Sequence, residues 1–256
     1  MTRYAVFRGE VVTPEQFDAM AGADYREKGW FPLCPACDAR LSVYGVRSPG
    51  VTSRFDHPDF SDCPLSSRPD PRFAHLSPVA WDLDAGRRLK AAFCEDQALM
   101  ESYAVCRALA LGCLGGKEFV RFCLSATRHR VWNYQGLPLW VVPYLLATLA
   151  DVQPNPTVRH ALRGRHTLRF VLEKPKRESI DAAWLSPQEC RLVCVFADSG
   201  KPVKTVEPVA LGAHRIEAAR TDTAWISPRL LAVLRECCLS HADSPCGCGD
   251  GSAAGG

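Results

Sequence analysis

The chain lacks the segments that would send it into or across a membrane. Its best apolar stretch, residues 137–150, has only about fourteen residues and contains Pro138 and Pro143, which suits a buried, kinked helix. The first residues are charged and have no apolar core of the kind that a secretory signal needs. Net charge is small as well, at +3, so no overall field selects a partner. We therefore expect no membrane partner and a cytoplasmic location.

The chain also lacks the short motifs that mark common catalytic sites. It has no glycine-rich phosphate loop, no nucleophile elbow and no His-Glu-x-x-His helix. A metal-dependent nuclease needs a strand with Glu-x-Lys or Asp-x-Lys. In this chain Glu173 is followed directly by Lys174, and Glu189 has Arg191 where the lysine is wanted. The sequence therefore favours action by binding and leaves enzymatic activity undecided.

Cysteine and hydrophobic residues are plentiful. Hydrophobic residues make up 47% of the 256 positions, enough to bury a core. The 13 cysteines are odd in number and follow no secretory signal, so a disulfide framework is not expected. Those with apolar neighbours are expected to be small buried hydrophobes. These are Cys94, Cys106, Cys113, Cys123, Cys190 and Cys194.

The most specific pattern is a set of metal-ligating residue types near the N-terminus. Cys34 and Cys37 form a Cys-x2-Cys pair, and His57 and Cys63 follow after nineteen and five further residues. Three thiolates and one imidazole at this spacing are typical of a structural zinc site, which leaves no open position for catalysis. His75 lies in a second Arg-Phe-x-His string and is the alternative to His57. We expect Zn²⁺ as the cofactor.

Positive charge is densest over residues 159–177, where Glu173 is the one acid. Arginine pairs well with phosphate, so this stretch is a candidate surface for nucleic acid. The candidate contacts are Arg159, Arg163, Arg165, Arg169, Lys174, Lys176 and Arg177. A second basic spot, residues 128–130, lies beside Trp132 as a stacking partner. The alternative is a solvated surface whose charge is balanced elsewhere.

A cysteine-rich segment lies near the C-terminus. It holds Cys237, Cys238, His241, Cys246 and Cys248. These residue types would allow a second metal, but their spacing is irregular and glycines separate them. Adventitious metal capture or redox lability is the alternative reading of this segment.

The pattern of apolar and turn residues predicts strands near both ends and helices between them. Thr13, Pro14 and Gln16 form the signature of a capped helix start. Three-four spacing predicts one long helix over residues 84–111 and a second over 117–131. Further strands and a final helix are predicted at residues 4–7, 11–12, 41–44, 167–172, 191–196, 203–211 and 228–237.

Together these elements predict an α+β fold with a small zinc-bound N-terminal module, a helical middle and a C-terminal region of mixed strands and helices. The predicted divisions are a zinc-binding module at 1–76, a helical region at 77–150, a mixed α/β basic region at 151–238 and a disordered Cys- and Gly-rich tail at 239–256.

The first seventy or so residues resemble the CoiA-like competence proteins of bacteria. The shared features are the Ala-Val-Phe-Arg-Gly opening at 5–9, the ligand residues Cys34, Cys37, His57 and Cys63, and Phe55. The family has His-Phe-Ala-His where this chain has Arg54-Phe55-Asp56-His57. The resemblance implies a bacterial, zinc-binding protein associated with DNA. The family's nuclease half has an acidic and lysine signature that residues 77–256 do not show, so nuclease activity is not carried over.

Three functions remain open from the sequence. The first is a zinc-binding protein that engages nucleic acid, DNA or RNA, through its basic surface and acts by binding. The second is a divergent CoiA-like nuclease, with Asp82, Asp84 and Glu101 near Lys90 as candidate residues. The third is an adaptor that docks a protein partner, with zinc as a structural support.

Overall fold

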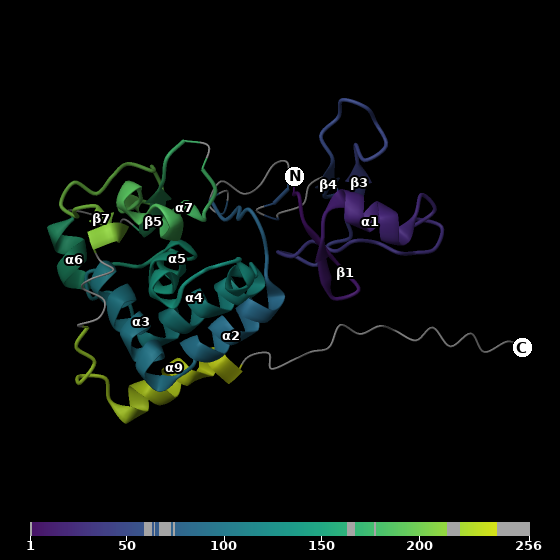
Figure 1. Ribbon diagram of the computed structural model, residues 1–256. Coiled ribbons are helices and arrows are strands. Elements are labelled where there is room, and N and C mark those ends of the chain that lie inside the picture. Colours follow the sequence, from purple (N-terminus) through teal and green to yellow (C-terminus); the bar gives the residue numbers. More distant parts are fainter. Residues whose placement is uncertain are drawn as a thin grey trace, which may run out of the picture.

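The chain forms a small N-terminal module beside a larger body of helices and sheet (Figure 1). The computed structural model describes residues 2–58, 63, 65–66, 73, 75–162, 167–176, 178–213 and 221–239. The fold is α+β, as predicted, and every sheet among these residues is antiparallel. Nearly all of the predicted tail lies outside the described residues. No helix in the described part of the chain is long and apolar enough to cross a bilayer.

The N-terminal module begins with a hairpin and a capped helix. Its elements are β1 (Ala5–Phe7), β2 (Glu10–Val12), α1 (Pro14–Ala21), β3 (Ser42–Tyr44) and β4 (Arg54–Asp56). Arg8 and Gly9 both have positive φ at the hairpin tip, the backbone of a type I′ turn. The Thr13 side chain accepts from the Gln16 N–H, and the Gln16 side chain accepts from the Thr13 N–H, which confirms the predicted capping box.

Aromatic packing holds this module together. The Phe17 ring of α1 meets the rings of Phe7, Tyr25 and Phe55 edge-on, with centroids 4.9, 5.2 and 6.2 Å away. Edge-on pairs of this kind contribute roughly 0.5–1.5 kcal/mol each beyond their buried area. Since Phe55 lies on β4, the same packing fixes the strand that leads to His57.

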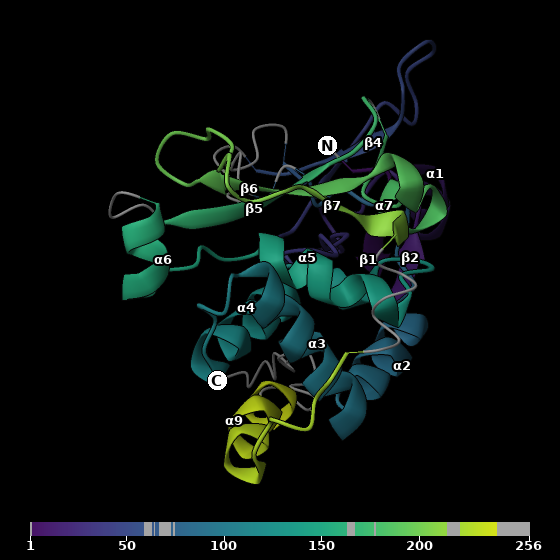
Figure 2. The same cartoon turned by 90° about the vertical axis from the view of Figure 1, so that its left-hand side faces the viewer.

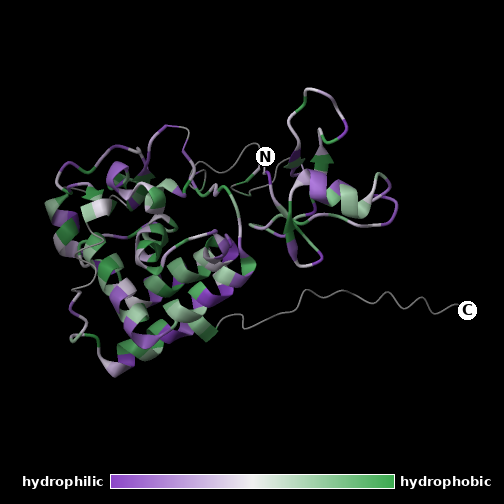
Figure 3. Cartoon of the chain, in the orientation of Figure 1, coloured by the Kyte–Doolittle hydropathy of each residue, from purple (hydrophilic) through white to green (hydrophobic). Residues whose placement is uncertain are grey.

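The body is built from helices that share one core. They are α2 (Leu83–Phe93), α3 (Asp96–Leu109), α4 (Gly116–Arg128), η1 (Val131–Asn133), η2 (Leu139–Val141), α5 (Val142–Thr148), α6 (Pro156–Ala161), α7 (Ala182–Leu185), η3 (Pro187–Glu189) and α9 (Pro228–Leu239). Figure 3 shows hydrophobic and hydrophilic segments alternating along α2, α3 and α4, as expected of helices with one buried face. Helix α9 packs against α3 and α4, so the predicted helical and C-terminal regions share a core.

The single long helix predicted over residues 84–111 is wrong. The first helix ends at its C-cap, Cys94, and a second helix begins at Asp96. The two are separate because the backbone of Glu95 is extended, with φ −63° and ψ 137°. The apolar spacing continues across this break, which is why the pattern did not predict it. Asp96 becomes the first residue of α3, where a carboxylate is favoured by the helix dipole.

A three-stranded sheet covers one side of α5 (Figure 2). Its strands are β5 (Leu168–Glu173), β6 (Arg191–Phe196) and β7 (Val209–Ala210), in that order. Leu168, Phe170 and Leu172 alternate toward the core. The strand predicted over residues 203–211 is reduced to β7, because residues 204–206 form a turn and Pro208 has no N–H to donate to a ladder.

Cysteine placement confirms part of the prediction and corrects part of it. Cys106, Cys123, Cys190 and Cys194 are buried thiols, as expected. Cys94 and Cys113 are instead half-buried, and Cys94 is bonded to Cys238, 144 residues away along the chain.

Candidate metal centre

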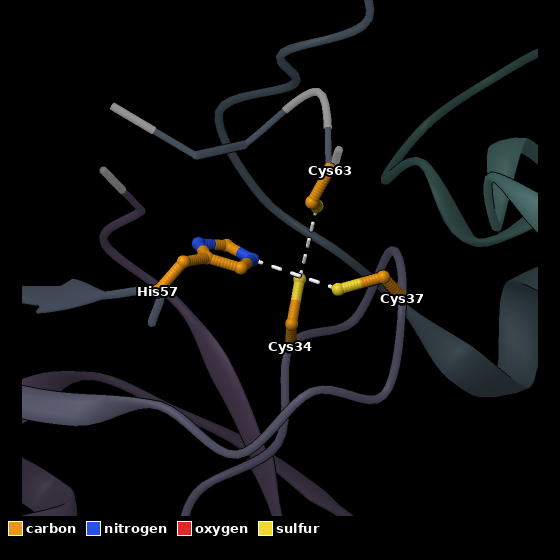
Figure 4. Close-up of side chains that lie close together, drawn as sticks. All are labelled: Cys34, Cys37, His57 and Cys63. Atoms are coloured by element: carbon orange, nitrogen blue, oxygen red, sulfur yellow. Dashed lines mark hydrogen bonds between the residues drawn. The ribbon is translucent and has the colours of Figure 1, made fainter. Parts of the chain in front are cut away.

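The four predicted ligands lie together. One ligand atom from each of Cys34, Cys37, His57 and Cys63 lies within 4.8 Å of every other. Figure 4 shows the three sulfurs and one imidazole nitrogen facing a common point. Cys34 and Cys63 are buried, and Cys37 is exposed, so the cluster lies at the edge of the module. Among the described residues this is the one group of three or more metal-ligating side chains.

A tight turn places the first two sulfurs. The Asp38 N–H donates to the Cys34 carbonyl at 2.9 Å, and the Cys34 N–H donates to the Ala39 carbonyl at 2.8 Å. Asp38 closes the turn with φ +57°, a conformation that Asp tolerates better than most residues. The Ala36 N–H donates to the Cys34 sulfur at 3.3 Å. This knuckle therefore aims both thiols at one point and supplies an amide donor to one of them.

Strand β4 and the segment after it place the other two ligands. Phe55 is fully buried and pairs with Val43 of β3, and its backbone also exchanges two hydrogen bonds with Thr2, at 3.1 and 2.8 Å. His57 leaves this strand with Nε2 toward the cluster and Nδ1 away from it (Figure 4). The sulfur of Cys63 accepts from the Leu65 N–H at 3.4 Å.

The spacing of the ligand atoms fits a tetrahedral ion. Zinc bonds of about 2.3 Å to sulfur and about 2.05 Å to nitrogen place two sulfurs about 3.8 Å apart, and a sulfur and a nitrogen about 3.6 Å apart. The Cys34 and Cys63 sulfurs are 3.6 Å apart. The Cys37 sulfur and His57 Nε2 are also 3.6 Å apart. These two distances match a tetrahedral zinc ion, and all four ligand atoms lie within 4.8 Å of one another.

The electrostatics of the three thiols require a cation if all are to be charged. Hydrogen bonds from Cys34 and Cys63 hold the pKa of Cys37 well below its usual range. The pKa of Cys34 is raised, because its thiol hydrogen-bonds to Cys37 and Cys63 and is buried. A hydrogen bond from Cys34 lowers the pKa of Cys63, but the bond to Cys37 and burial outweigh it and raise that pKa to about 11. A bound cation would remove the two retained protons.

The alternative ligand His75 lies elsewhere. Its Nε2 forms a 2.8 Å hydrogen bond with Thr148 Oγ1, on helix α5 of the body. The cluster contains His57 instead. The choice of histidine made from the Cys-x2-Cys spacing is therefore the one that the geometry favours.

The predicted basic stretch is only partly described. Arg163, Arg165 and Arg177 lie outside the described residues. Of the remaining candidates, three side chains form hydrogen bonds or ion pairs within the protein, and one is exposed. Arg169 forms a two-bond ion pair with Asp151, at 2.9 and 3.1 Å. Arg159 donates to the Pro154 carbonyl, and Lys174 donates to the Glu178 carbonyl. Lys176 is exposed.

The second basic spot differs from its prediction. Trp132 is buried and donates to Thr127 at 3.0 Å, so it is a core residue and no stacking platform. His129 is buried against the Phe73 ring, 4.2 Å between centroids, and Arg130 pairs with Asp38 of the cysteine knuckle. This segment joins the body to the module.

A groove of about 820 Å³ runs along the outer face of β5 and β6. Three cationic side chains line it: Arg169, Lys174 and Arg191. Two acids, Glu173 and Glu189, line it as well. Sequence reasoning missed Arg191, which lies directly across from Glu173 in the β5–β6 register. The signal that could have found it is strand alternation. Arg169 and Glu173 lie on the same face of β5, and Arg191 pairs with Glu173 on that face.

The candidate nuclease residues have separate roles. Asp82 caps α2 by accepting from the Ala85 N–H, and Asp84 pairs with Arg87. Glu101 accepts from Gln97 on α3. Within the described residues they join no metal-ligating cluster.

No family model, curated protein or solved structure matches this chain. The CoiA-like resemblance of the N-terminal segment stays a prediction, and the function must be argued from the site.

Proposed function

We propose that this protein binds one Zn²⁺ through Cys34, Cys37, His57 and Cys63 and engages nucleic acid through the groove on its sheet. The observation that carries the zinc site is the convergence of three sulfurs and one imidazole at tetrahedral spacing. The groove cations Arg169, Lys174 and Arg191 support the nucleic-acid part.

Zinc is the metal that this ligand set favours. Thiolate is a soft ligand and imidazole a borderline one, and a tetrahedral arrangement of three and one is common for zinc and rare for magnesium or calcium. All four positions come from the protein, so the ion has a structural role. Three thiolates must remain reduced to hold it, so we propose a reducing compartment such as the cytoplasm for this protein.

The ion would connect the cysteine knuckle to the segment around Cys63, which the short strands of the module do not hold together by themselves. The knuckle carries Cys34 and Cys37, and Cys63 begins the connection toward the body. The strands of the module have only three residues each, too few for a stable sheet without support. Zinc therefore contributes folding free energy here, as it does in small zinc modules generally.

The groove has the chemistry of a phosphate-binding surface. Guanidinium groups pair bidentately with phosphate oxygens, and an ammonium adds a point charge. Arg191 is exposed, and Arg169 can exchange its partner Asp151 for phosphate. The acids Glu173 and Glu189 limit this attraction, so we propose moderate affinity that depends on salt. Binding, not catalysis, is the proposed activity.

The test is a titration of zinc-loaded protein against single- and double-stranded DNA and RNA at two salt concentrations. The expected result is affinity that falls steeply with salt and that is reduced in Arg191→Ala and Lys174→Ala. The matched control is Arg88→Ala, which removes one exposed cation from α2, away from the sheet. Absence of binding, or equal loss in all three variants, contradicts the proposed groove. Affinity that does not fall with salt would show that phosphate contacts do not carry the binding. Absence of binding in protein shown to hold zinc would turn the search to a protein partner.

A further inference from the structure

Four cysteines lie next to one another, each in contact with the next, where α2, α4 and α9 meet. Cys94, at the end of α2, is bonded to Cys238 of α9, with their Cα atoms 5.8 Å apart. The Cys237 sulfur lies 3.7 Å from the Cys238 sulfur. Cys123 of α4 donates a hydrogen bond to Cys237, which lowers the pKa of Cys237.

Exposure divides this group into a half-buried pair and a buried pair. Cys123 and Cys237 are buried, with 2% and 4% of their surface exposed. Cys94 and Cys238 are half-buried, so the bonded pair is the half nearer to solvent. A disulfide next to a further thiol is the arrangement in which exchange between sulfurs occurs.

We propose that Cys94 and Cys238 form a redox-active pair that exchanges with low-molecular-weight thiols and disulfides, with the Cys237 thiol as a donor to the sulfur that leaves. The reversibility of this bond rests on the proposed zinc site. That site needs reduced cysteines, and in a reducing compartment a disulfide is usually transient and used for redox sensing or catalysis. The Cys94–Cys238 bond is therefore a reversible one.

The exchange balances with two small thiols. A thiolate attacks the Cys94 sulfur, the bond to Cys238 breaks, and its electron pair passes to the Cys238 sulfur. A second thiolate attacks the small-molecule sulfur of this mixed disulfide, so the bond to Cys94 breaks, the small disulfide forms and Cys94 leaves as a thiolate. Both protein thiolates take up the protons that the two small thiols released. The protein disulfide is reduced, two small thiols are oxidised, and the reverse sequence restores the bond.

Cys237 would act on the leaving step. Bonded Cys238 carries no proton, so in this contact the Cys237 thiol is the donor. A hydrogen bond to the departing sulfur stabilises its thiolate, and a better leaving thiolate departs faster. Cys237 is thus a positioning residue, and Cys94 and Cys238 are the residues that react.

Reduction would release the end of α9 from α2. The helix would then be held by the ion pair of Arg235 with Asp96 and by packing of Leu230 against Gly116 of α4. The pair therefore links the redox state of the surroundings to the attachment of one helix.

The test uses the full, zinc-loaded chain in glutathione buffers that run from mostly oxidised to mostly reduced. Free thiols are alkylated and each peptide is measured by mass spectrometry. Cys94 and Cys238 are expected to change together, from linked to alkylated, within the series. Cys113, a half-buried free thiol, is the internal control and stays alkylated throughout. A pair that remains linked in every buffer, or never links, overturns the proposal.

Variants separate the roles. Cys94→Ser and Cys238→Ser are expected to abolish the transition. Cys237→Ala is expected to slow reduction several-fold, and Cys237→Ser, which keeps a hydroxyl donor, to restore most of the rate. An unchanged rate in Cys237→Ala overturns the role of that thiol. Zinc content is measured in the same samples. If the Cys94–Cys238 pair still changes between linked and alkylated in protein that holds no zinc, the redox proposal stands while the proposed zinc site fails.

Discussion

Asp38 and Arg130 form an ion pair that joins the cysteine knuckle to the helical body. Both residues have left-handed backbones, with φ of 57° and 53°. Both side chains are about half exposed, so the pair itself contributes no more than about 1 kcal/mol. Its position matters more than its strength, because Asp38 directly follows a metal ligand, Cys37.

The backbone at Asp38 gives the first prediction. Asp38→Gly is expected to leave zinc affinity nearly unchanged, because glycine adopts positive φ freely. Asp38→Val is expected to weaken zinc binding by about 1–2 kcal/mol, roughly tenfold, since a branched side chain opposes this conformation. Competition with a coloured chelator measures both affinities. Equal affinities in the two variants would show that the turn does not position the ligands.

The ligand set gives the second prediction. Wild-type protein is expected to hold one zinc ion per chain, and Cys37→Ser or Cys63→Ser to lose it. Structural zinc sites have apparent binding free energies of about 10–16 kcal/mol at pH 7, so one missing ligand lowers affinity by orders of magnitude. Metal analysis after gel filtration measures the content, and the absorption of a Co²⁺-loaded sample reports thiolate ligation. Cys113→Ser is the control, and equal zinc content in all variants would reject the site.

The zinc ligands could be predicted from sequence because their residue types and their spacing along the chain are enough to indicate a metal site. The Cys34–Cys37 spacing encodes a knuckle, and few residue types compete with thiolate and imidazole for zinc. The hairpin and the helix cap at Thr13 could be predicted for the same reason, since a turn or cap depends on neighbouring residues.

The remaining features depend on contacts between distant segments. Nothing near Cys94 indicates Cys238 as its partner, because the pairing follows from the packing of α9 on the body. The groove needs Arg169 and Arg191 on adjacent strands, a fact of register and not of local pattern. Trp132 looks like a stacking residue beside two arginines, but burial against α2 gives it a place in the core.

Packing at Gly86 gives the third prediction. In an isolated helix, Gly→Ala stabilises by roughly 0.5–1 kcal/mol. At Gly86 an added Cβ would lie 2.8 Å from Asn133 Cα and 3.0 Å from the Trp132 carbonyl oxygen, both backbone atoms. Gly86→Ala is therefore expected to destabilise by about 1–3 kcal/mol, because η1 must move away from α2. Urea denaturation measures the change, with Ala92→Gly on the exposed side of α2 as the propensity control. A stabilised Gly86→Ala variant would show that the two segments are not in this contact.

The buried carboxyl of Asp181 gives the fourth prediction. Burial raises its pKa above the usual 3.8, although the Val79 N–H donates to it at 3.0 Å and opposes the rise. A carboxyl group whose pKa is higher in the folded protein costs stability once it is ionised. The cost is full above the folded pKa and disappears as pH falls toward the unfolded value. Asp181→Asn is therefore expected to be more stable than wild type at neutral pH.

The pH dependence is what distinguishes this effect from a change in packing. The difference in free energy of unfolding between Asp181→Asn and wild type should shrink as the pH is lowered through the folded pKa toward 3.8. Denaturation at a series of pH values measures it, with Glu27→Gln, an exposed carboxylate, as control. A difference that stays constant with pH would mean that ionisation of Asp181 plays no part.

The link between α2 and α9 gives the fifth prediction. Cys238→Ser is expected to lower the free energy of unfolding of oxidised protein by about 2–4 kcal/mol, since the bond closes a long loop and restricts the unfolded chain. Reductant should remove the difference, because the wild type then loses the same restriction. Cys113→Ser, which breaks no disulfide, should show little change in either condition. Chemical denaturation with and without reductant measures all three proteins, and a Cys238→Ser deficit that persists in reductant would assign the loss to packing of α9 instead of the bond.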